Sequence, residues 1–581
     1  MKMRNVLLVY PEFEPSFWSF KFALRYIGKK SSMPPLGLLT IAGMFPEGYH
    51  LRLADMNVRP LTDRDIAWAD LVCTSTMIVQ RRSHAEVAVR CKNANKPVVA
   101  GGPYPTSYWE EMGDIDYLLL GEVEETFVPF LRDLESGTAR RITAPPERPA
   151  ITQTPMPRYD LIRMRDYGAM LLQFSRGCPF DCEFCDITKL YGRIPRTKSN
   201  EQMLAEFQML YDLGRHGGLF LVDDNFIGNR RDALRFLKAL AEWQRIHQYP
   251  FTLFTEASMN LVEHEELMDA MVAAGFKAVF VGIETPTPEA LLITKKKQNV
   301  GKTDPEYPLH AVQILQHKGL EVMGGFILGL DGDGPDAFDA HIRFIQAAAI
   351  PIAMEGMLTA LKGTDLYHRL QREGRLLGDT TGQNVTTQLN FIPQMPAQAL
   401  VDGYKRVLDT IYDRGLKKYF QRCWDMNESI DRSAHPVSAQ TPLMADQTIR
   451  FCIYTLGQLL SVEGPAYLRF LLRVLRKKPA LLREALAFGA KGHHLRKVTE
   501  CVLAVDTFKE ELAAELAAIQ AYLSEQMRQS HDAIRTYMAG TARRVRSRYM
   551  ALHEDFRHNA ADALEAFLTS LERMTERYHS A

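Results

Sequence analysis

The sequence predicts an α/β protein whose C-terminal part is all-helical, and three observations lead to this fold class. In residues 1–140, short apolar runs alternate with helical patterns, as they do in a doubly wound parallel sheet. In residues 166–395 the alternation returns with longer periods and gives six strand–helix units, enough for an open, partial (β/α)6 barrel. In residues 396–581 apolar side chains recur at spacings of three and four, which indicates helices alone.

The composition is that of an ordinary soluble chain. It has 581 residues, 46% hydrophobic and 24% charged, and this length predicts about three or four domains. Lys+Arg and Asp+Glu both number 70, and the resulting zero net charge argues against a general nucleic-acid binder. No apolar run reaches the ~18 residues that a membrane span needs, and the N-terminus lacks a signal core. We therefore expect a cytoplasmic protein.

The first sheet is predicted from four apolar runs with helices between them, Ile66–Asp70 and Arg82–Asn93 among these. The runs are Asn5–Tyr10, Leu71–Ser75, Pro97–Ala100 and Asp116–Leu120. Ligands of such sheets bind outside the carboxyl ends of the strands, where the chain carries Gly101-Gly102 and Gly121-Glu122. A glycine pair lets the backbone approach a ligand closely, although alone it is a weak signal.

Residues 141–165 are rich in proline and predict an extended linker. The barrel is expected after it, in residues 166–395. Its predicted strands are Met170–Phe174, Leu219–Asp223, Phe251–Glu256, Ala278–Glu284, Val322–Leu328 and Ala353–Leu358.

Three cysteines follow the first of these strands at spacings of four and three: Cys178, Cys182 and Cys185. Thiolates are soft ligands that suit iron–sulfur clusters, and three of them can hold three irons of a cubane while the fourth iron stays open. A zinc site would need a fourth ligand, and no cysteine or histidine lies nearby in the sequence. An unusual zinc site or a chance group of buried cysteines is the alternative. The other five cysteines lie in apolar contexts and are expected to be buried free thiols in a reducing compartment: Cys73, Cys91, Cys423, Cys452 and Cys501.

Polar residues stand where the apolar strands end. Candidate ligand-binding residues at the second, third and fourth strand ends are Asp223, Asp224, Asn225, Glu256, Ser258 and Glu284. Each carboxylate has an alternative as a helix N-cap or a solvated loop charge. Four polar strand ends in one barrel, with the cysteines on the first, favour a binding site.

The segment Cys178-x3-Cys182-x2-Cys185 resembles the signature of the radical S-adenosylmethionine (SAM) enzymes. The resemblance implies that a [4Fe–4S] cluster on these cysteines binds and reductively cleaves SAM. It places the aromatic residue before the last cysteine, Phe184, beside the adenine. Gly325 and Ile327 match the family's Gly-x-Ile-x-Gly segment, also beside the adenine. The Asp223-Asp224-Asn225 segment departs from the Gly-Gly-Glu that many members carry, and it is expected to receive the SAM ammonium group.

The N-terminal loops, together with Pro34-Pro-Leu-Gly-Leu38, resemble the cobalamin-binding domain that precedes many radical SAM cores. This resemblance implies a cobalamin site formed by Leu36, Gly37, Ser75, Gly101, Gly102, Gly121 and Glu122. The Asp-x-His-x-x-Gly motif that gives cobalt a histidine in many cobalamin proteins is absent, and Asp339-Ala-His341 lies in the wrong domain. We expect no protein histidine on cobalt. A degenerate sheet with a purely structural role is the alternative.

The order of these phrases, with Trp18-Ser-Phe-Lys21, is similar to a subfamily that carries a C-terminal helical domain of unknown function and includes hopanoid C-2 methylases. The resemblance implies a cobalamin-dependent C-methyltransferase: one SAM methylates cobalamin, and another is cleaved to a radical that activates an unreactive carbon of a lipid-like substrate, such as a hopanoid. An external electron donor is implied. The alternatives are a non-methylating rearrangement, cyclisation or coupling, and a non-catalytic cobalamin or SAM sensor.

Helical patterns in the C-terminal region cover Gln398–Leu408, Thr448–Leu460, Ala466–Leu475, Leu481–Phe488 and Phe508–Ala561. Basic residues alternate with leucines in one stretch: Arg469, Arg473, Arg476, Lys477, Lys478 and Arg483. A basic amphipathic helix can lie on an anionic membrane surface, so the stretch predicts peripheral contact at the inner face of the membrane. The alternative is a helix that covers a domain core and keeps its charges in water.

Overall fold

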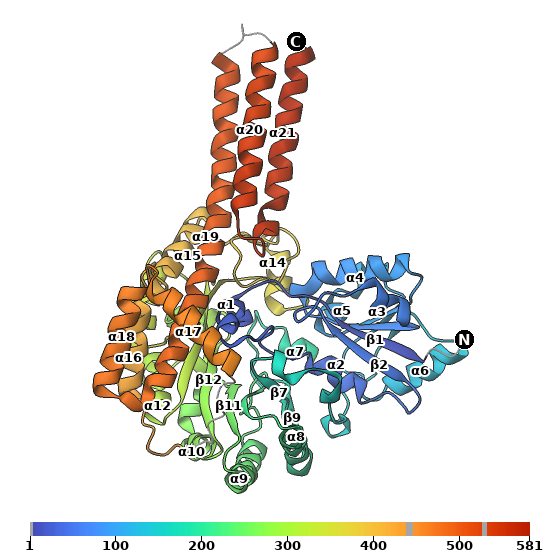
Figure 1. Ribbon diagram of the computed structural model, residues 1–581, viewed down its shortest axis with the longest axis vertical. Coiled ribbons are helices and arrows are strands. Elements are labelled where there is room, and N and C mark those ends of the chain that lie inside the picture. The colour runs from blue at the N-terminus through green and yellow to red at the C-terminus, as the bar shows by residue number, and fades with distance from the viewer. Residues whose placement is uncertain (1–3, 437–444, 526–530, 581) are drawn as a thin grey trace.

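The computed structural model describes residues 4–436, 445–525 and 531–580 (Figure 1). Two parallel sheets of six strands each lie side by side, and helices follow them in the chain. The first sheet and its helices lie at the right of Figure 1, and the second sheet lies at the left. The predicted α/β class with a helical C-terminal region is confirmed.

The first sheet has the strand order β2-β1-β3-β4-β5-β6, and every pair is parallel. Its strands are β1 (Asn5–Tyr10), β2 (His50–Asp55), β3 (Leu71–Ser75), β4 (Val98–Gly101), β5 (Tyr117–Leu119) and β6 (Ile142–Thr143). The central strands are apolar because both of their faces are covered. One face packs on α2 (Leu36–Ala42) and α6 (Phe127–Ser136). The other packs on α3 (Asp63–Trp68), α4 (Arg81–Asn93) and α5 (Pro103–Tyr108), so the sheet is doubly wound as predicted.

Two strands of this sheet were not predicted. The edge strand β2 alternates exposed and half-buried side chains at its start, so its sequence lacks the apolar run of a central strand. The short strand β6 lies within the proline-rich stretch and pairs with β5 at the opposite edge. Part of the expected linker therefore belongs to the first sheet, and the division of the chain into domains stays a prediction.

The second sheet follows the chain order β7-β10-β11-β12-β13-β14, and its two end strands do not pair. Its strands are β7 (Met170–Leu172), β10 (Gly217–Leu221), β11 (Phe251–Glu256), β12 (Phe276–Glu284), β13 (Glu321–Leu328) and β14 (Ala353–Met357). The crossover helices are α8 (Asn200–Asp212), α9 (Arg230–Ile246), α10 (Glu265–Ala273), α12 (Tyr307–His317) and α13 (Ala337–Ala347), and α14 (Asp365–Arg372) follows β14. Six parallel strands in sequence order, open on one side, form the predicted partial barrel.

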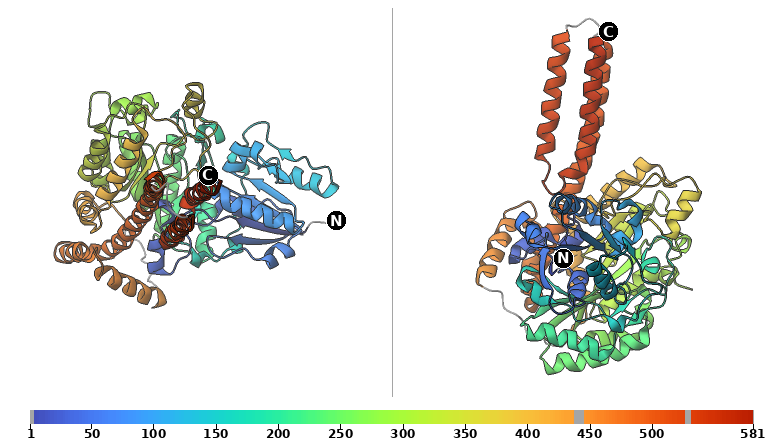
Figure 2. Two further views of the ribbon diagram at one scale, coloured as in Figure 1. Left: turned by 90° about the horizontal axis from the view of Figure 1, so that it is seen from above. Right: turned by 90° about the vertical axis from the view of Figure 1, so that its right-hand side faces the viewer.

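The C-terminal helices continue the hydrophobic core of the barrel. They are α15 (Ala397–Ile411), α16 (Lys417–Ser429), α17 (Ala445–Leu459), α18 (Gly464–Lys477), α19 (Leu482–Glu525), α20 (His531–Ala551) and α21 (Ala561–Ser580). Helix α16 was not predicted. The predicted stretch Phe508–Ala561 is divided between α19 and α20, and its residues 526–530 lie outside the described part. The end of α19 projects from the body together with α20 and α21 (Figures 1 and 2).

The segment after β1 crosses from the first sheet to the C-terminal helices. His494 of α19 contacts the backbone carbonyl of Phe17 through Nε2 at 3.0 Å, and Lys21 forms a 2.6 Å ion pair with Asp555. Between these contacts and the first sheet, the Trp18 ring lies 4.8 Å from the Phe280 ring of β12. The N-terminal segment therefore joins the first sheet, the barrel and α19.

Two expectations about single features have different outcomes. Within the described ranges, no helix combines the length and the apolar character needed to cross a bilayer. Cys452 was expected to be buried, but it is exposed on α17 because most of this helix faces solvent.

Candidate active site

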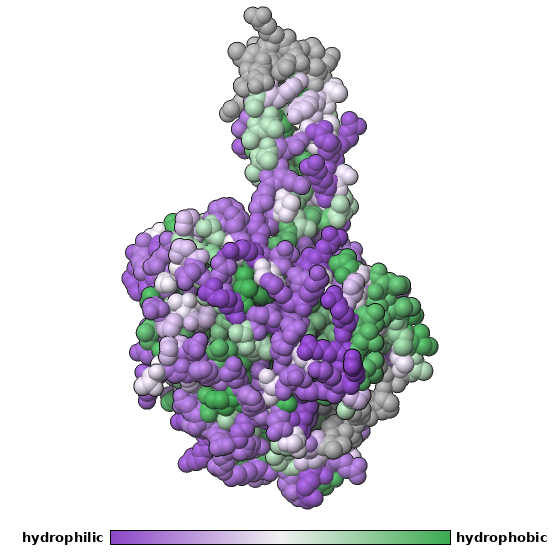
Figure 3. Space-filling model, turned by 90° about the vertical axis from the view of Figure 1, so that its left-hand side faces the viewer, coloured by the Kyte–Doolittle hydropathy of each residue, from purple (hydrophilic) through white to green (hydrophobic). Residues whose placement is uncertain are grey.

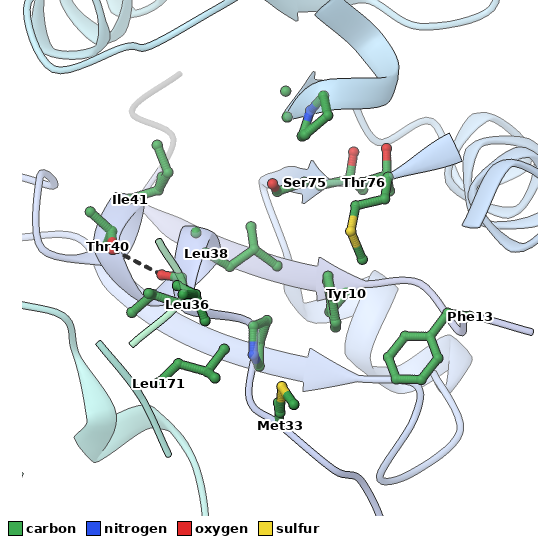
Figure 4. Close-up of a pocket in the computed structure, with 18 of the residues that line it drawn as sticks. Tyr10, Phe13, Met33, Leu36, Leu38, Thr40, Ile41, Ser75, Thr76 and Leu171 are labelled. Atoms are coloured by element: carbon green, nitrogen blue, oxygen red, sulfur yellow. Dashed lines mark hydrogen bonds between the residues drawn. The ribbon is translucent and has the colours of Figure 1, made fainter. Parts of the chain in front are cut away.

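A cavity of about 650 Å³ lies between the carboxyl ends of the first sheet and the mouth of the barrel. All seven residues expected to bind cobalamin line it: Leu36, Gly37, Ser75, Gly101, Gly102, Gly121 and Glu122. Leu36, Leu38 and Ile41 of α2 lie along one side, Ser75 and Thr76 at the end of β3 lie along another, and Leu171 comes from β7 of the barrel (Figure 4). A ligand bound by the first sheet would therefore face the barrel directly.

Gly102 allows the loops after β3 and β4 to meet. Its backbone has a φ of +98°, and a Cβ atom there would lie 2.9 Å from Ser75 Oγ and from the backbone nitrogen of Thr76. Only glycine fits this close approach without displacing the neighbouring loop. The sequence signal at Gly101-Gly102 therefore reports a real constraint on the cavity wall.

The three cysteines lie between the two strands of a small antiparallel ribbon, β8 (Ser175–Arg176) and β9 (Arg196–Thr197). All three are free and partly exposed. Gly177, with a φ of +95°, begins the loop, and a Cβ atom there would lie 2.9 Å from the carbonyl oxygen of Gly192. The ribbon and this glycine thus hold the loop against the barrel.

Two amide side chains, one after β10 and one in the turn that follows α11 (Pro288–Ile293), donate hydrogen bonds to two of the sulfur atoms. Asn225 Nδ2 lies 3.7 Å from Cys178 Sγ, and Gln298 Nε2 lies 3.5 Å from Cys182 Sγ. Oδ1 of the same Asn225 accepts 3.2 Å bonds from the backbone and the hydroxyl of Ser258. The second and third strand ends therefore meet the cysteine loop, as expected. Hydrogen bonds to thiolate sulfur suit an iron–sulfur cluster, since they tune its reduction potential.

The described residues contain no group of three His, Cys, Asp or Glu side chains close enough to hold one metal ion. In a cubane cluster each cysteine binds a different iron, so the three sulfur atoms need not converge on a point. The spacing of Cys178, Cys182 and Cys185 suits such a cluster.

Buried carboxyl groups gather beside the cysteine loop. Burial raises the pKa of Asp223 to about 7, of Asp224 to about 6 and of Glu256 to about 8. The negative charges of Asp224, Asp223 and Glu284 further raise the pKa of Glu256. Such a group of carboxyls favours a cationic ligand, which would stabilise their ionised forms.

Lys296 is a basic side chain that lies among these carboxyls. Its Nζ lies 2.7 Å from Glu284 Oε1 and 6.0 Å from the centre of the Phe184 ring. Burial lowers its pKa, but the charges of Glu284, Cys182 and Cys185 outweigh burial and hold the pKa above its ordinary value. No sequence pattern predicts this role for Lys296, because a run of three lysines, 295–297, is typical of a solvated loop.

Asp223 is engaged by the chain itself. One of its carboxylate oxygens accepts a 2.6 Å hydrogen bond from the Ser175 hydroxyl and a bond from the Ser175 backbone, and the other accepts one from the backbone of Phe174. These bonds fix the turn from β7 into the cysteine ribbon. Asp224 accepts a 3.3 Å bond from the backbone of Gly177, and we find no side-chain donor to it among the described residues, so it is the freer of the two carboxyls.

Glu122 lines the cavity but its carboxylate binds arginines of the ribbon. Arg176 Nη1 lies 2.7 Å from Glu122 Oε2 and 2.7 Å from Glu124 Oε1, and Arg196 Nη2 lies 2.5 Å from Glu122 Oε1. Both glutamate side chains are only 3% exposed. The Glu122 side chain therefore fastens the loop after β5 to the cysteine ribbon.

The other predicted SAM-binding residues lie at the same end of the barrel. Phe184 and Ile327 pack against one apolar cluster formed by residues around β14 and α14. Gly325 leaves room for the Phe280 ring, because a Cβ atom there would lie 2.8 Å from Phe280 Cζ. The assignment of Phe184, Gly325 and Ile327 to the adenine stays a prediction.

Aromatic side chains form the barrel side of the cavity region. The Phe220 and Phe254 rings of β10 and β11 stack with centres 4.6 Å apart, and Trp18 packs on Phe280. Trp18, Phe220 and Leu171 line the cavity itself. The sequence predicts no role for Trp18, because its position on the barrel depends on contacts of its neighbours with α19, far away in the chain.

Family models match three consecutive parts of the chain. A B12 binding domain matches residues 29–131, the Radical SAM superfamily matches residues 172–345, and a domain of unknown function, DUF4070, matches residues 364–506.

Two curated relatives match most of the chain. An uncharacterized methyltransferase of Synechocystis sp. is 40% identical over 90% of this chain and 95% of its own length. The hopanoid C-2 methylase of Rhodopseudomonas palustris is 35% identical over 72% of this chain and 79% of its own length. The chain belongs to the cobalamin-binding radical SAM methyltransferase family. It is an enzyme of this family, and its cofactors are a [4Fe–4S] cluster, SAM and cobalamin.

Solved structures show the same fold. The radical SAM methyltransferase TsrM from Kitasatospora setae, with tryptophan substrate and a SAM analogue bound, aligns with a TM-score of 0.53 and 16% identity over 86% of this chain and 98% of its own. The cobalamin-dependent radical SAM enzyme OxsB, with aqua-cobalamin and SAM bound, aligns with a TM-score of 0.55 and 14% identity over 98% of this chain and 84% of its own.

Proposed function

We propose that this methyltransferase transfers a methyl group to an unactivated carbon of an apolar, lipid-like substrate such as a hopanoid. The observation that carries the proposal is the wall of Trp18, Phe220 and Leu171 between the cobalamin loops and the cysteine ribbon. Rings and aliphatic side chains recognise apolar surface and offer few hydrogen bonds to a polar substrate. The likeness to the hopanoid C-2 methylase supports the same class.

The chain's own residues fit the three cofactors. Cys178, Cys182 and Cys185 would hold the cluster, with Asn225 and Gln298 orienting two of the sulfurs. The loops at Ser75, Gly101-Gly102 and Gly121 would hold cobalamin against α2. When bound, the cofactors supply electron transfer to SAM and carriage of the methyl group.

For SAM, we assign the carboxyls of Asp224 and Glu256 to its positively charged part and Lys296 to its carboxylate. Burial leaves these groups in a low-dielectric site, where opposite charges attract more strongly than in water. Phe184, Gly325 and Ile327 would receive the adenine, and Asn225, Ser258 and Glu284 would fix the surrounding polar groups. Asp223 and Glu122 would support the site indirectly. Asp223 fixes the backbone of the turn after β7, and Glu122 fixes the arginines of the cysteine ribbon.

Incubation of the reconstituted enzyme with a cellular lipid extract and methyl-labelled SAM tests this function. We expect the label to enter an apolar product whose mass rises by one methyl group minus one hydrogen. An apolar product without the label would favour rearrangement, cyclisation or coupling. Label in a polar metabolite or peptide alone would contradict the substrate class.

An external electron donor and contact with the inner face of a membrane belong to this proposal, as does a location in the cytoplasm. The cluster needs an electron for each SAM that is cleaved, and the described residues show no second cysteine group that could relay it. An apolar substrate of this size would leave water for a membrane, so the enzyme would meet it there.

A further inference from the structure

Helices α17 and α18 expose a concentrated apolar surface, which we call the α17–α18 face. Nine of the 22 large apolar side chains that are exposed in the described structure lie between residues 449 and 475. They are Ile449, Ile453, Tyr454, Leu456, Leu460, Val462, Leu468, Leu472 and Leu475. In Figure 3 hydrophobic residues gather along the right-hand edge of the body. Single exposed apolar side chains are normal on a protein surface. A contiguous group on two neighbouring helices instead marks an interaction site.

The spacing of these residues shows two apolar stripes. Ile449, Ile453 and Leu456 of α17, with Leu460 directly after its last residue, recur every three or four positions and so share one side of that helix. Ile453 is 63% and Leu460 80% exposed, so this side faces away from the protein. Leu468, Leu472 and Leu475 repeat the pattern on α18.

The body of the protein contacts α17 on the side opposite this stripe. Tyr26 lies 5.9 Å from the Phe451 ring and 5.3 Å from the Tyr454 ring, and its hydroxyl donates a 3.1 Å bond to Gln458. Gln458 in turn donates a 2.7 Å bond to Glu463. These polar and aromatic contacts fix the helix while its aliphatic stripe stays outside.

The sequence predicted that six basic residues lie on a membrane surface, but three of them, Arg473, Lys477 and Lys478, contact α16. Arg473 lies 4.0 Å and Lys477 5.7 Å from the Trp424 ring of α16, and Lys478 donates a 2.7 Å bond to the carbonyl oxygen of Asn427. Arg469 and Arg476 remain exposed beside the leucine stripe. The outer surface therefore combines an apolar area on α17 and α18 with a cationic border on α18.

We propose that the α17–α18 face docks on an anionic lipid bilayer, with the aliphatic stripe of α17 inserted at the level of the acyl chains. Side chains such as Ile453 and Leu460 gain by leaving water, and Arg469 and Arg476 meet the negative headgroups beside them. The proposal deepens the proposed function, since it names where an apolar substrate would be met. Docking nevertheless depends on none of the active-site residues.

The charge of the face favours a membrane over a second copy of the chain. In a two-fold dimer the same patch meets itself, so Arg469 and Arg476 would be brought towards their own copies. An anionic surface instead neutralises this border.

Flotation of the full-length protein with vesicles tests the proposal. One set of vesicles contains phosphatidylcholine alone and the other contains phosphatidylcholine with phosphatidylglycerol. We expect at least tenfold tighter binding to the anionic vesicles at low salt, and weaker binding as salt is added. The combined variant Ile449→Gln, Ile453→Gln, Leu456→Gln and Leu460→Gln should weaken binding at least tenfold at every salt concentration.

The matched control carries Leu213→Gln and Ile246→Gln, two exposed apolar positions on other helices, and should bind as the wild type does. Arg469→Glu with Arg476→Glu should remove the preference for anionic vesicles.

Wild type that stays unbound at low salt, or an α17 variant that binds normally, would overturn the proposal. A wild-type dimer that the α17 substitutions convert to a monomer would also overturn it and assign the face to self-association. Methyl transfer to a lipid in detergent is measured separately, so failure of docking and failure of the proposed function can be distinguished.

Discussion

Cys178, Cys182 and Cys185 are expected to carry all of the cluster iron. Replacing the three with alanine should abolish the visible iron–sulfur absorption and SAM cleavage, because no other described group of cysteines lies together. Iron analysis and absorption spectra of the anaerobically reconstituted protein measure this. Cys452→Ala is the control, since this cysteine is exposed on α17 and should leave the iron content unchanged. A triple variant with a full complement of iron would contradict the assignment.

Glu256 should make the cofactor-free protein less stable at high pH. Burial raises its pKa from 4.5 to about 8, so between these values the folded chain holds a proton that the unfolded chain has lost. Stability therefore falls as the pH rises from about 4.5 to about 8. Glu256→Gln keeps an uncharged side chain, so its Tm relative to wild type should be higher at pH 8.5 than at pH 5.

The control for this measurement is Glu289→Gln, which replaces an exposed carboxyl on α11 (Pro288–Ile293). Its effect on Tm should be the same at both pH values. Equal effects of Glu256→Gln at pH 5 and pH 8.5 would show that the carboxyl is ionised throughout this range.

Cobalt should receive no ligand from a protein histidine, since the lining of the cavity within the described residues contains none. His84 is buried beside Thr74, and His341 lies in the barrel between Glu355 and Thr285. Electron paramagnetic resonance of the cobalt(II) form, with the protein's histidines labelled with nitrogen-15, measures this. A superhyperfine pattern that changes with the label would contradict the prediction, whereas nitrogen from cobalamin itself would be unaffected.

For single residues, the sequence predicted those whose role follows from their neighbours in the chain. The cysteine spacing and the Gly101-Gly102 pair are legible without a fold, and the strand-end polar residues do gather near the cysteines. Lys296 and the engagement of Asp223 could not be predicted, because each depends on a partner from another strand end.

Among the elements, the β8–β9 ribbon depends on carboxylates from the first sheet. Glu122→Ala should destabilise the protein by about 3 kcal/mol, because it leaves Arg176 and Arg196 buried without one of their counter-ions. The control Asp160→Ala breaks the exposed pair of Arg158 and Asp160 and should cost less than about 1 kcal/mol. Calorimetric unfolding of the cofactor-free proteins compares them. Equal effects of the two substitutions would show that the ribbon does not need Glu122.

Elements with strong apolar patterns were predicted well, and β11 has the predicted bounds, Phe251–Glu256. The weaker cases share a physical reason. The edge strand β2 and the helix α16 mix polar and apolar residues, because one is half exposed and the other buries Arg422 against backbone carbonyls. Nor could the sequence show that α17 leaves its aliphatic stripe uncovered, since an apolar stripe ordinarily predicts a buried face.

For the whole molecule, the sequence predicted the two sheets and the helical region but not how they are joined. Parallel strands in order predict each sheet separately, since the rules of crossover connection are local. Phe17 contacts His494 of α19, and Lys21 pairs with Asp555. Both contacts join residues more than 470 positions apart, so no periodic pattern in the sequence predicts them.

This long-range junction sets the order in which the enzyme can be completed during synthesis. The ribosome adds roughly 5–20 residues per second, so α19 emerges on the order of tens of seconds after the segment that contains Trp18. Until then Phe17 and Phe22 have no His494 to pack against, and the barrel wall at Phe280 lacks the indole that covers it. From the emergence of β14 until α19 follows, the nascent chain therefore carries an open, apolar barrel mouth, which makes it a client for chaperones that hold exposed hydrophobic surface.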